Sequence, residues 1–434
     1  MTKFTPTLSK QVLGSTLQVL LFALLLAGFG ASAALAQTRA YVTNNNDDTV
    51  SVIDTATNSV IATVPVGASP AGVAVTPNGR FAYVTNQLGN SVSVISALSN
   101  TVVATIPVQS FPKAIAMHHS GAFAYVTTSG SNISVIDTAT NTVVNSISVT
   151  FPVDLALSPT ADLGYVTHSS VVNGVTVINT ATNSVVTNIP LPADVTVTAA
   201  VSPDGAFVYV TCLTVGTGSK IAVIDTATNT LVTIVPLPGT FAPGVVFTPD
   251  GALAYVANNG GGVCCGGGGG SSSYSVIDTA THTEFARMPI GSPNGIAVTP
   301  DGAFVYITDL FDNTLKVVST FNHGVAAIVP VGNFPQGVAI ATLTAPPTPP
   351  PTLTERVEAL IAEGALSQEQ GAGLLDKIRE ATAKHEAGMT AAACNQLSSF
   401  INQVKAFIGN GTLTPAQGQP LIDAANAIKS DIGC

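Results

Sequence analysis

Charged residues are scarce in this sequence, and no part of it is strongly basic. Asp, Glu, Lys and Arg make up 9% of the 434 residues, whereas an ordinary soluble domain holds roughly 25%. The formal net charge is −10, and the basic residues of the central region stand one at a time, at Arg39, Arg80, Lys113, Lys220, Arg287 and Lys316. Because nucleic-acid-binding proteins usually carry a basic stripe, the sequence predicts no nucleic-acid partner.

Long apolar runs are also rare. Residues 17–27 form an apolar run with one polar residue, Gln18; Lys3 and Lys10 precede it, and the sequence A-L-A follows at 34–36. This order is typical of a signal peptide with its cleavage site, and the run is shorter than the ~20 residues that a membrane span needs. We expect residues 1–36 to be removed, with a retained membrane anchor as the alternative. The mature chain is then expected to have no transmembrane segment and to be secreted, periplasmic or at the cell surface.

Cysteine is rare as well, with five residues at Cys212, Cys264, Cys265, Cys394 and Cys434. Export permits disulfide bonds, and the odd number leaves at least one thiol without a partner within the chain. Cys264 and Cys265 lie in a loop of Gly and Ser. They either pair with each other, or one of them pairs with Cys212, and the sequence leaves this choice open.

An internal repeat is the most informative feature that is present. A motif similar to Tyr-Val-Thr-Asn occurs seven times, at Tyr41, Tyr83, Tyr125, Tyr165, Tyr209, Tyr255 and Tyr306. Each copy is followed by a second motif similar to S-V-I-D-T-A-T-N. Position four of this second motif is Asp, Asn or Ser, and position eight is Asn or His, which are residues typical of turns. His282 and His323, at position eight, are therefore predicted to be turn residues rather than ligands.

Each repeat contains four short strands. In the second copy we expect strands at 73–76, 81–85, 91–95 and 101–107, with the turn Asn78-Gly79 joining the first two. Four antiparallel strands in about 42 residues are typical of one blade of a β-propeller. The first copy lacks its first strand, and an extra strand at 337–340 follows the last copy. That strand can complete the first blade and remove the open edges, so residues 37–344 are predicted to form an all-β seven-bladed β-propeller.

These repeats resemble those of the YVTN β-propeller family of exported and surface-layer proteins of bacteria and archaea. The resemblance covers roughly Thr38 to Leu343. It implies the propeller fold, and it says little about function, because one fold hosts many functions.

One ring of side chains surrounds the expected mouth of the propeller channel. It consists of the residues that follow each Tyr-Val-Thr motif, where the repeats diverge. We predict a ligand-binding role for six of them, with hydrogen bonding at the strand ends as the alternative: Asn44, Asn86, Thr128, His168, Asn258 and Asp309.

Two candidate metal sites follow from the sequence. Asp309 and Asp312 of the last blade become neighbours of Asp47 and Asp48 of the first blade when the ring closes, and clustered carboxylates favour Ca²⁺. The alternative is two solvated loops. The pair at residues 118–119 is His-His, but no Cys or carboxylate accompanies it at ligand spacing, so the sequence favours a turn there.

Aromatic residues mark the predicted loops between blades. Phe111, Phe151, Phe241 and Phe334 either form an apolar rim for a sugar or protein partner or pack between the blades. Both roles agree with the sequence.

The C-terminal part has a different composition and period. Residues 345–352 are rich in proline and are expected to act as a semi-rigid linker. Over 353–434 the apolar residues recur with helical spacing, which predicts a small all-α four-helix bundle. Ser367 with Gln370 forms a capping box, Thr390 is expected to cap the third helix, and Thr414 starts the fourth. A disulfide between Cys394 and Cys434 is expected to join the third helix to the chain end.

The C-terminal segment resembles the FIMAH domain, a helical module of exported bacterial proteins. The matching stretches are A-C-N-Q-L-S-S-F-I-N-Q-V and L-T-P-A-Q-G-Q-P-L-I-D-A-A-N. The resemblance implies an accessory, surface-associated module and no chemistry.

The sequence therefore favours an exported, monomeric, non-enzymatic binding or scaffold protein. Its expected partner is a protein, a glycan or a small ligand at the cell envelope, and no cofactor beyond the candidate Ca²⁺ is expected. The alternative is a propeller enzyme of the lactonase or lyase type, for which His168, Asp309 and Asp154 are the available groups near the channel. No nucleophile–base pair is evident among them. A quinone cofactor is disfavoured because the propellers that bind one usually stack it on Trp, and this sequence has none.

Overall fold

The structure, a computed structural model, describes residues 37–169, 174–192, 195–214, 218–237, 239, 241–260, 272–343, 352–432 and 434. The predicted signal peptide, the loop with Cys264 and Cys265 and most of the proline-rich linker lie outside these residues. The chain divides into two compact units between Thr344 and Ala345, and each is described by itself.

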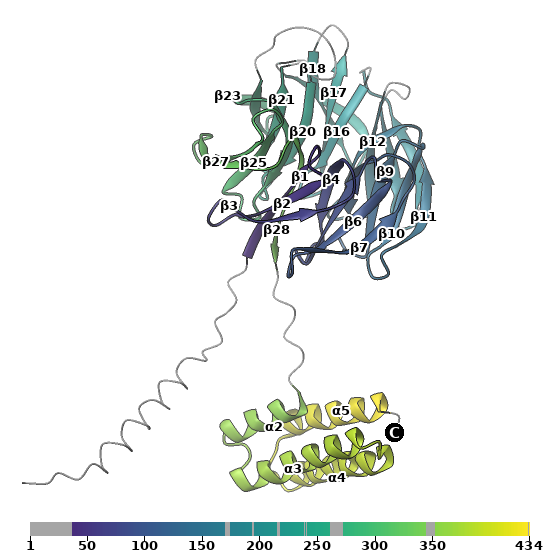
Figure 1. Cartoon of the computed structure of the whole chain (residues 1–434), viewed down its shortest axis with the longest axis vertical. Coiled ribbons are helices and arrows are strands. Elements are labelled where there is room, and N and C mark those ends of the chain that lie inside the picture. The colour runs from purple at the N-terminus through teal and green to yellow at the C-terminus, as the bar shows by residue number, and fades with distance from the viewer. Residues whose placement is uncertain are drawn as a thin grey trace, which may run out of the picture. The chain divides into compact units, whose positions relative to one another are not determined.

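The first unit is the seven-bladed β-propeller that the repeats predict (Figure 1). Blade 1 consists, from the innermost strand outward, of β28 (Pro335–Leu343), β1 (Gln37–Asn44), β2 (Thr49–Asp54) and β3 (Ser59–Pro65). Blade 2 consists of β4 (Pro70–Val75), β5 (Phe81–Asn86), β6 (Ser91–Ser96) and β7 (Thr101–Pro107). Blade 3 consists of β8 (Pro112–Met117), β9 (Phe123–Thr128), β10 (Asn132–Asp137) and β11 (Thr142–Ser148). Blade 4 consists of β12 (Pro152–Leu157), β13 (Leu163–His168), β14 (Val175–Asn179) and β15 (Ser184–Ile189). Blade 5 consists of β16 (Val195–Val201), β17 (Phe207–Thr214), β18 (Gly218–Asp225) and β19 (Thr230–Pro236). Blade 6 consists of β20 (Phe241–Phe247), β21 (Leu253–Asn259), β22 (Ser273–Asp278) and β23 (Thr283–Pro289). Blade 7 consists of β24 (Pro293–Val298), β25 (Phe304–Asp309), β26 (Thr314–Ser319) and β27 (Val325–Pro330).

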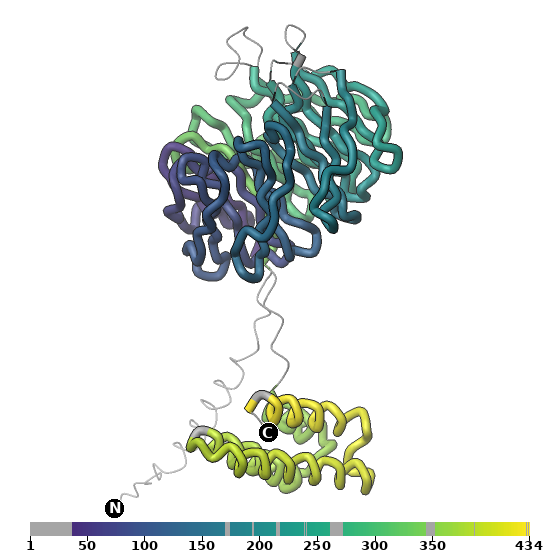
Figure 2. Tube along the Cα trace, turned by 90° about the vertical axis from the view of Figure 1, so that its right-hand side faces the viewer, coloured from purple at the N-terminus to yellow at the C-terminus, as the bar shows by residue number. Residues whose placement is uncertain are grey.

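The ring closes through the extra strand that the sequence indicates. β28 pairs antiparallel with β1, from Gln37 opposite Leu343 to Val42 opposite Val338. The innermost strands of consecutive blades pack side by side, and the series ends with β24 against β28 and β28 against β4. Figure 2 shows the start of the propeller, in purple, next to its end, in green. Every sheet therefore has a neighbour on both faces.

The core of the propeller consists of apolar layers between consecutive blades. Between blades 1 and 2, for example, Tyr41 and Val52 pack against Val84 and Ile95, and all four are buried. Because both faces of each sheet are covered, the middle strands can be apolar on both sides. This accounts for the shortage of charge in the sequence.

Turns between the third and fourth strands have one conformation in all seven blades. Position eight of the second motif has a φ between 51° and 55° in every copy, at Asn58, Asn100, Asn141, Asn183, Asn229, His282 and His323. Asn and His tolerate this left-handed region better than most residues. His282 and His323 are thus turn residues, as the sequence predicts.

The Thr of the Tyr-Val-Thr motif connects neighbouring blades. In blade 2 the hydroxyl of Thr85 accepts from the Gly72 amide (2.8 Å) and donates to the Lys113 carbonyl of blade 3 (2.7 Å). Corresponding Thr residues bond in the same way in five other blades, at Thr43, Thr127, Thr167, Thr211 and Thr308. These bonds fix the innermost strand of one blade to that of the next.

The second unit is the predicted bundle of four helices. They are α2 (Leu353–Ala362), α3 (Gln368–Glu386), α4 (Thr390–Gly409) and α5 (Pro415–Asp431). Capping boxes begin α2 at Thr352, α3 at Ser367 and α5 at Thr414. The expectation for α4 is wrong, because its N-cap is Met389 and Thr390 is already helical. Among the described residues, no helix is long and apolar enough to cross a membrane.

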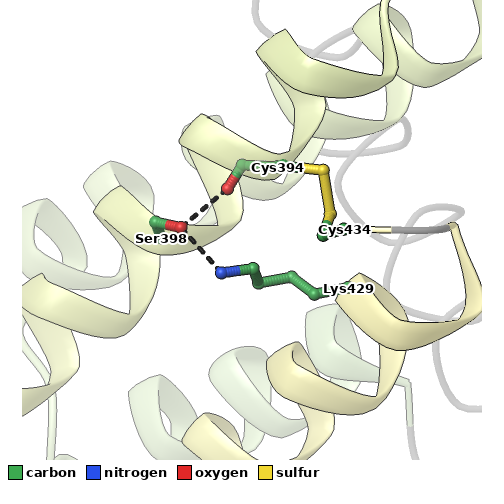
Figure 3. The surroundings of a disulfide bond; sticks show 4 residues. All are labelled: Cys394, Ser398, Lys429 and Cys434. Carbon is green, nitrogen blue, oxygen red and sulfur yellow. Dashed lines mark hydrogen bonds between the residues drawn. A yellow bond between two sulfur atoms is a disulfide. The ribbon is translucent and has the colours of Figure 1, made fainter.

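The predicted disulfide joins Cys394 of α4 to Cys434, with their Cα atoms 5.9 Å apart (Figure 3). Next to it, Lys429 donates to the hydroxyl of Ser398 (2.9 Å), and that hydroxyl donates to the Cys394 carbonyl (2.8 Å). The C-terminal end of α5 is thereby attached to α4.

Candidate functional site

One face of the propeller carries the loops in which the repeats diverge. We call it the loop face and define it by the loops after the second strands (45–48, 87–90, 129–131, 310–313) and the loops that enter the innermost strands (66–69, 108–111, 149–151, 331–334). The two kinds of loop bond to each other, as in Leu88 N to Ala68 O (3.2 Å) and Leu310 N to Ser292 O (3.0 Å).

The six residues predicted to bind ligand lie beneath this face. Each is at most 1% exposed: Asn44, Asn86, Thr128, His168, Asn258 and Asp309. The amide of Asn86, for example, donates to the hydroxyls of Ser91 and Ser93 in the next strand (both 3.0 Å). This geometry supports the alternative of hydrogen bonding at the strand ends, and ligand contact by these six residues stays a prediction.

His168 shows this structural role clearly. Its Nδ1 lies 2.7 Å from the Thr150 carbonyl, which can only accept, so Nδ1 carries the proton. Its Nε2 therefore accepts from the Thr176 hydroxyl at 2.8 Å. Burial lowers the pKa of His168, so both ring nitrogens are engaged in a neutral imidazole.

In blade 7 an ion pair replaces the Asn–Ser pair of other blades. Lys316 bonds to the buried carboxylate of Asp309 and lies 3.3 Å from that of Asp312. Burial alone would raise the pKa of Asp309, but the bond and charge of Lys316 outweigh it and hold that pKa below its ordinary value. The carboxylates of Asp309 and Asp312 thus already share a cationic partner, Lys316. Lys316 occupies the position that Ser93 has in blade 2, and the sequence alone did not indicate this pairing.

The other two candidate Ca²⁺ ligands bond to backbone amides. Asp47 accepts from the Asn333 amide (2.7 Å), and Asp48 accepts from the Ser69 amide (2.7 Å). Among the described residues, the four carboxylates do not form a cluster close enough to share an ion. The Ca²⁺ site stays a prediction without geometric support.

Cys212 is a buried free thiol in β17. Burial raises its pKa to about 12. A thiol that stays protonated at neutral pH is a poor nucleophile. Its predicted partners, Cys264 and Cys265, lie outside the described residues.

The channel mouth on the loop face is a cavity of about 300 Å³. All seven innermost strands contribute to its lining, and the polar side chains among them are Lys113, Asp154, Thr198, Asn294 and Gln336. Except for Asp154, none of these residues is predicted from the sequence to lie at the channel. Their signal is the pair of positions near the start of each innermost strand, directly after a proline in five of the seven blades, where the repeats change from Ala71-Gly72 to other residues.

Asp154 occupies a position that most blades give to Gly or Ala. A Cβ at Gly72 would lie 2.6 Å from the Lys113 carbonyl of the next blade, which explains the small residue there. Asp154 accepts instead from the hydroxyl of Thr198 (2.6 Å) and the amide of Ala199 (3.1 Å) in blade 5. Burial raises its pKa above the ordinary value, against the opposing effect of these hydrogen bonds.

Aromatic side chains lie in the loops of the loop face, and Phe241 of β20 lines the cavity itself. Phe111, Phe151 and Phe311 are 37%, 45% and 57% exposed, and the ring of Phe311 packs edge-on against Phe334 at 6.1 Å. Phe111, Phe151 and Phe334 each precede Pro and have a φ between 46° and 56°, which is an uncommon conformation for a bulky residue. Partial exposure supports the apolar rim, one of the two roles that the sequence allows.

Comparison with solved structures shows the propeller fold. A hydrazine synthase structure from Kuenenia stuttgartiensis matches with a TM-score of 0.57 at 23% identity, covering 63% of this chain and 95% of that chain. A functionally unknown protein from Desulfotomaculum acetoxidans matches at 0.59 and 20%, over 70% and 98% of the two chains. A putative 6-phosphogluconolactonase from Bacteroides uniformis matches at 0.58 and 13%, over 70% and 100%.

The likeness shows the fold alone. These structures differ widely in their described activities, and identity below 25% transfers none of them to this chain. No family model matches the sequence. No curated protein matches it either.

Proposed function

We propose that this protein is an exported binding protein of the YVTN propeller type, which holds a glycan on its loop face and catalyses no reaction. The observation that carries the proposal is that the loop face combines partly exposed Phe rings in its loops with a small polar cavity. Resemblance of the repeats to YVTN propellers, and of the helical unit to the FIMAH domain, supports a location at the cell surface.

A sugar matches this combination of groups. A sugar ring has an apolar C–H face, which packs on an aromatic ring, and a border of hydroxyls, which need hydrogen-bond donors and acceptors. Phe111 and Phe151 supply the aromatic faces, while Asn294, Gln336 and Thr198 supply neutral polar groups at the cavity. Lys113 adds one cationic donor for a carboxylated or otherwise anionic sugar.

The channel mouth is poorly arranged for acid–base chemistry. Among the described residues that line it, Lys113 and Asp154 are the two that titrate, and no ion pair joins them. The carboxyl of Asp154 is bonded to Thr198 and Ala199, as described above. General acid–base catalysis needs a group free to exchange a proton with the substrate, so the geometry favours binding over the lactonase or lyase alternative.

A glycan screen tests the proposal. The mature chain, residues 37–434, is applied to an array of bacterial cell-wall fragments and neutral and acidic oligosaccharides, and each hit is measured by calorimetry. We expect the double variant Phe111→Ser/Phe151→Ser to bind hits at least tenfold more weakly. Serine suits this backbone, because Ser69 occupies the equivalent position with a φ of 52°.

The matched control is Phe321→Ser, which removes a 94% exposed ring from the turn before β27. It is expected to bind like the unchanged protein. Equal binding by the double variant, or no hit on the array, would contradict the proposal. Hydrolysis of a lactone by the unchanged protein would favour the enzyme alternative, and the same screen on residues 37–343 shows whether binding needs the helical unit.

A further inference from the structure

On the face opposite the loop face, two neighbouring turns bring three metal-ligating side chains together. His118 and His119 lie in the turn between β8 and β9, and Asp162 lies in the turn between β12 and β13. His118 Nε2 is 3.2 Å from Asp162 Oδ1, and the two imidazole rings are 4.1 Å apart. One ligand atom from each of the three lies within 4.8 Å of the others.

All three residues depart from the repeat. The His118 position is Thr or Ser in the other blades that have this turn, at Thr76, Ser158, Ser202, Thr248 and Thr299. The His119 position is Pro in those blades, and the Asp162 position is Arg in one blade and Ala in the others. Three substitutions that are far apart in the sequence thus meet at one point of the fold.

Packing of the turns explains why they meet. The turn of each blade lies close to the turn of the preceding blade. If Gly121 of blade 3 had a Cβ, that atom would lie 3.1 Å from the side chain of Pro77 in blade 2. A Cβ at Gly302 would similarly lie 3.3 Å from Pro249. Residues 158–162 of blade 4 therefore face residues 118–119 of blade 3.

His118 keeps the turn intact and reaches beyond it. In other blades a hydroxyl bonds within the turn, as Thr248 does with Asp250 (2.6 Å). His118 does this with Nδ1, which lies 2.7 Å from the hydroxyl of Ser120. Its Nε2 is then directed across the blade boundary at the Asp162 carboxylate, where a proton or a metal ion is needed between nitrogen and oxygen.

We propose that His118, His119 and Asp162 bind one divalent transition-metal ion, for which Zn²⁺ is the natural probe. Two imidazoles and one carboxylate are a typical zinc donor set with an open fourth position. Tetrahedral Zn²⁺ with bonds of 2.0–2.1 Å holds its ligand atoms about 3.3 Å apart, close to the present separation of His118 and Asp162. His119 is exposed, so its ring can rotate toward the ion.

When Nε2 binds the ion, Nδ1 keeps the proton of the ring and donates to the Ser120 hydroxyl, which supports the ring from outside the metal site. Metal-bound imidazoles usually bond through their second nitrogen, which fixes the ring. The ion joins blades 3 and 4 and binds the folded state, so the stability of the propeller rises with the concentration of free ion relative to its Kd.

Zinc titration of the mature protein tests the site, with variants that restore the repeat residues. His119→Pro and Asp162→Ala place Pro and Ala where other blades have them, so both variants are expected to fold. Calorimetry with ZnCl₂ is expected to show one ion per chain for the unchanged protein and at least tenfold weaker binding for each variant. Zn²⁺ should also raise the thermal midpoint of the unchanged protein more than those of the variants.

His385→Ala is the control, because His385 is an exposed histidine of α3. It is expected to bind Zn²⁺ as tightly as the unchanged protein. If the unchanged protein binds no Zn²⁺, or if His119→Pro and Asp162→Ala bind it equally well, the proposal is wrong and His118–Asp162 is only a hydrogen bond between blades. A loss confined to His385→Ala would place the ion in the helical unit and would likewise overturn the proposal.

Discussion

At position eight of the second motif, His replaces Asn in two blades and bonds to the same partner, a Tyr hydroxyl of the preceding blade. In blades 3 and 4 the Oδ1 of Asn141 and Asn183 accepts from the Tyr hydroxyl of the preceding blade, at 2.8 and 2.9 Å. In blade 6 the Nδ1 of His282 does so with Tyr209 (2.7 Å). In blade 7 the Nδ1 of His323 lies 2.8 Å from the Tyr255 hydroxyl. A neutral imidazole nitrogen thus replaces an amide oxygen as acceptor.

This replacement predicts a contribution of the two histidines to acid sensitivity. Burial lowers the pKa of both His282 and His323 in the folded state, below the ordinary value of about 6.5. The unfolded chain therefore binds more protons, and stability present above pH 6.5 is lost as the pH falls through the folded pKa. The double variant His282→Asn/His323→Asn, measured by urea unfolding, should lose less stability between pH 7.5 and pH 5.5 than the unchanged protein.

At pH 7.5 the double variant should differ from the unchanged protein by no more than about 1 kcal/mol, because Asn fits the same backbone and accepts the same bond. An equal loss of stability in acid for both proteins would assign that loss to other groups. His168→Asn is not a suitable comparison, since both ring nitrogens of His168 are bonded.

At position eight of the second motif, the residue type predicts the left-handed backbone conformation but does not predict which side chain the residue bonds to. Asn and His are both typical of left-handed turns, so the sequence was sufficient to assign His282 and His323. Their Tyr partners lie 73 and 68 residues earlier in the chain, and only the contact between blades joins them. The same holds for His118 and Asp162, which are 44 residues apart.

At the scale of the strand, the Thr bridges between blades explain a regular break in pairing. In blade 2 the pairing of β4 with β5 shifts between Pro70 and Val73, because the Gly72 amide bonds to the Thr85 hydroxyl in place of a carbonyl. Blade 6 has Ala257 at the Thr position, and there the pairing continues one residue further, with Gly244 opposite Ala257. The side chain thus determines where the bulge begins.

Removal of one such hydroxyl should weaken the propeller measurably. We expect Thr85→Ala to lower the free energy of unfolding by about 2 kcal/mol, at about 1 kcal/mol for each hydrogen bond, because it loses both the bond from the Gly72 amide and the bond to the Lys113 carbonyl. Thr85→Ser keeps the hydroxyl and should lose less. Urea unfolding of both variants checks this, and an equal loss would mean that the methyl group rather than the hydroxyl matters.

The positions of the strands could be predicted because the repeat period and the turn residues are local features of the sequence. The depth at which a side chain is buried depends on distant segments, so it could not be predicted. The ring from Asn44 to Asp309 has the polar composition of a surface, and the sequence therefore allowed a ligand role. In the structure these side chains are buried by the loops above them and bond within their own blades. The polar residues that do face the channel, such as Asn294 and Gln336, occupy a position that is Ala, Lys, Val or Pro in the other blades.

At the scale of the molecule, closure of the ring of seven blades depends on one pairing, that of β1 with β28, between the two ends of the propeller. β1 follows directly after the predicted signal peptide, and β28 comes about 300 residues later in the chain. Until β28 arrives, β1 and the innermost strands of blades 2 and 7 have an open neighbour. Unpaired strand edges favour association with other chains, so closure is expected to be the step that gives a soluble monomer.

Two truncations that differ by one strand test this expectation. A chain of residues 37–343 keeps β28 and lacks the helical unit, whereas a chain of residues 37–334 lacks both. We expect the first to be monomeric by light scattering and to unfold in one cooperative transition, because the propeller is a compact unit by itself. The second should aggregate or melt without cooperativity, because blade 1 loses its innermost strand and the Thr43 hydroxyl loses its bond with the Gly337 amide. A soluble, cooperatively melting monomer of residues 37–334 would show that the ring tolerates a three-stranded blade, and closure by β28 would then be a consequence of folding rather than its requirement.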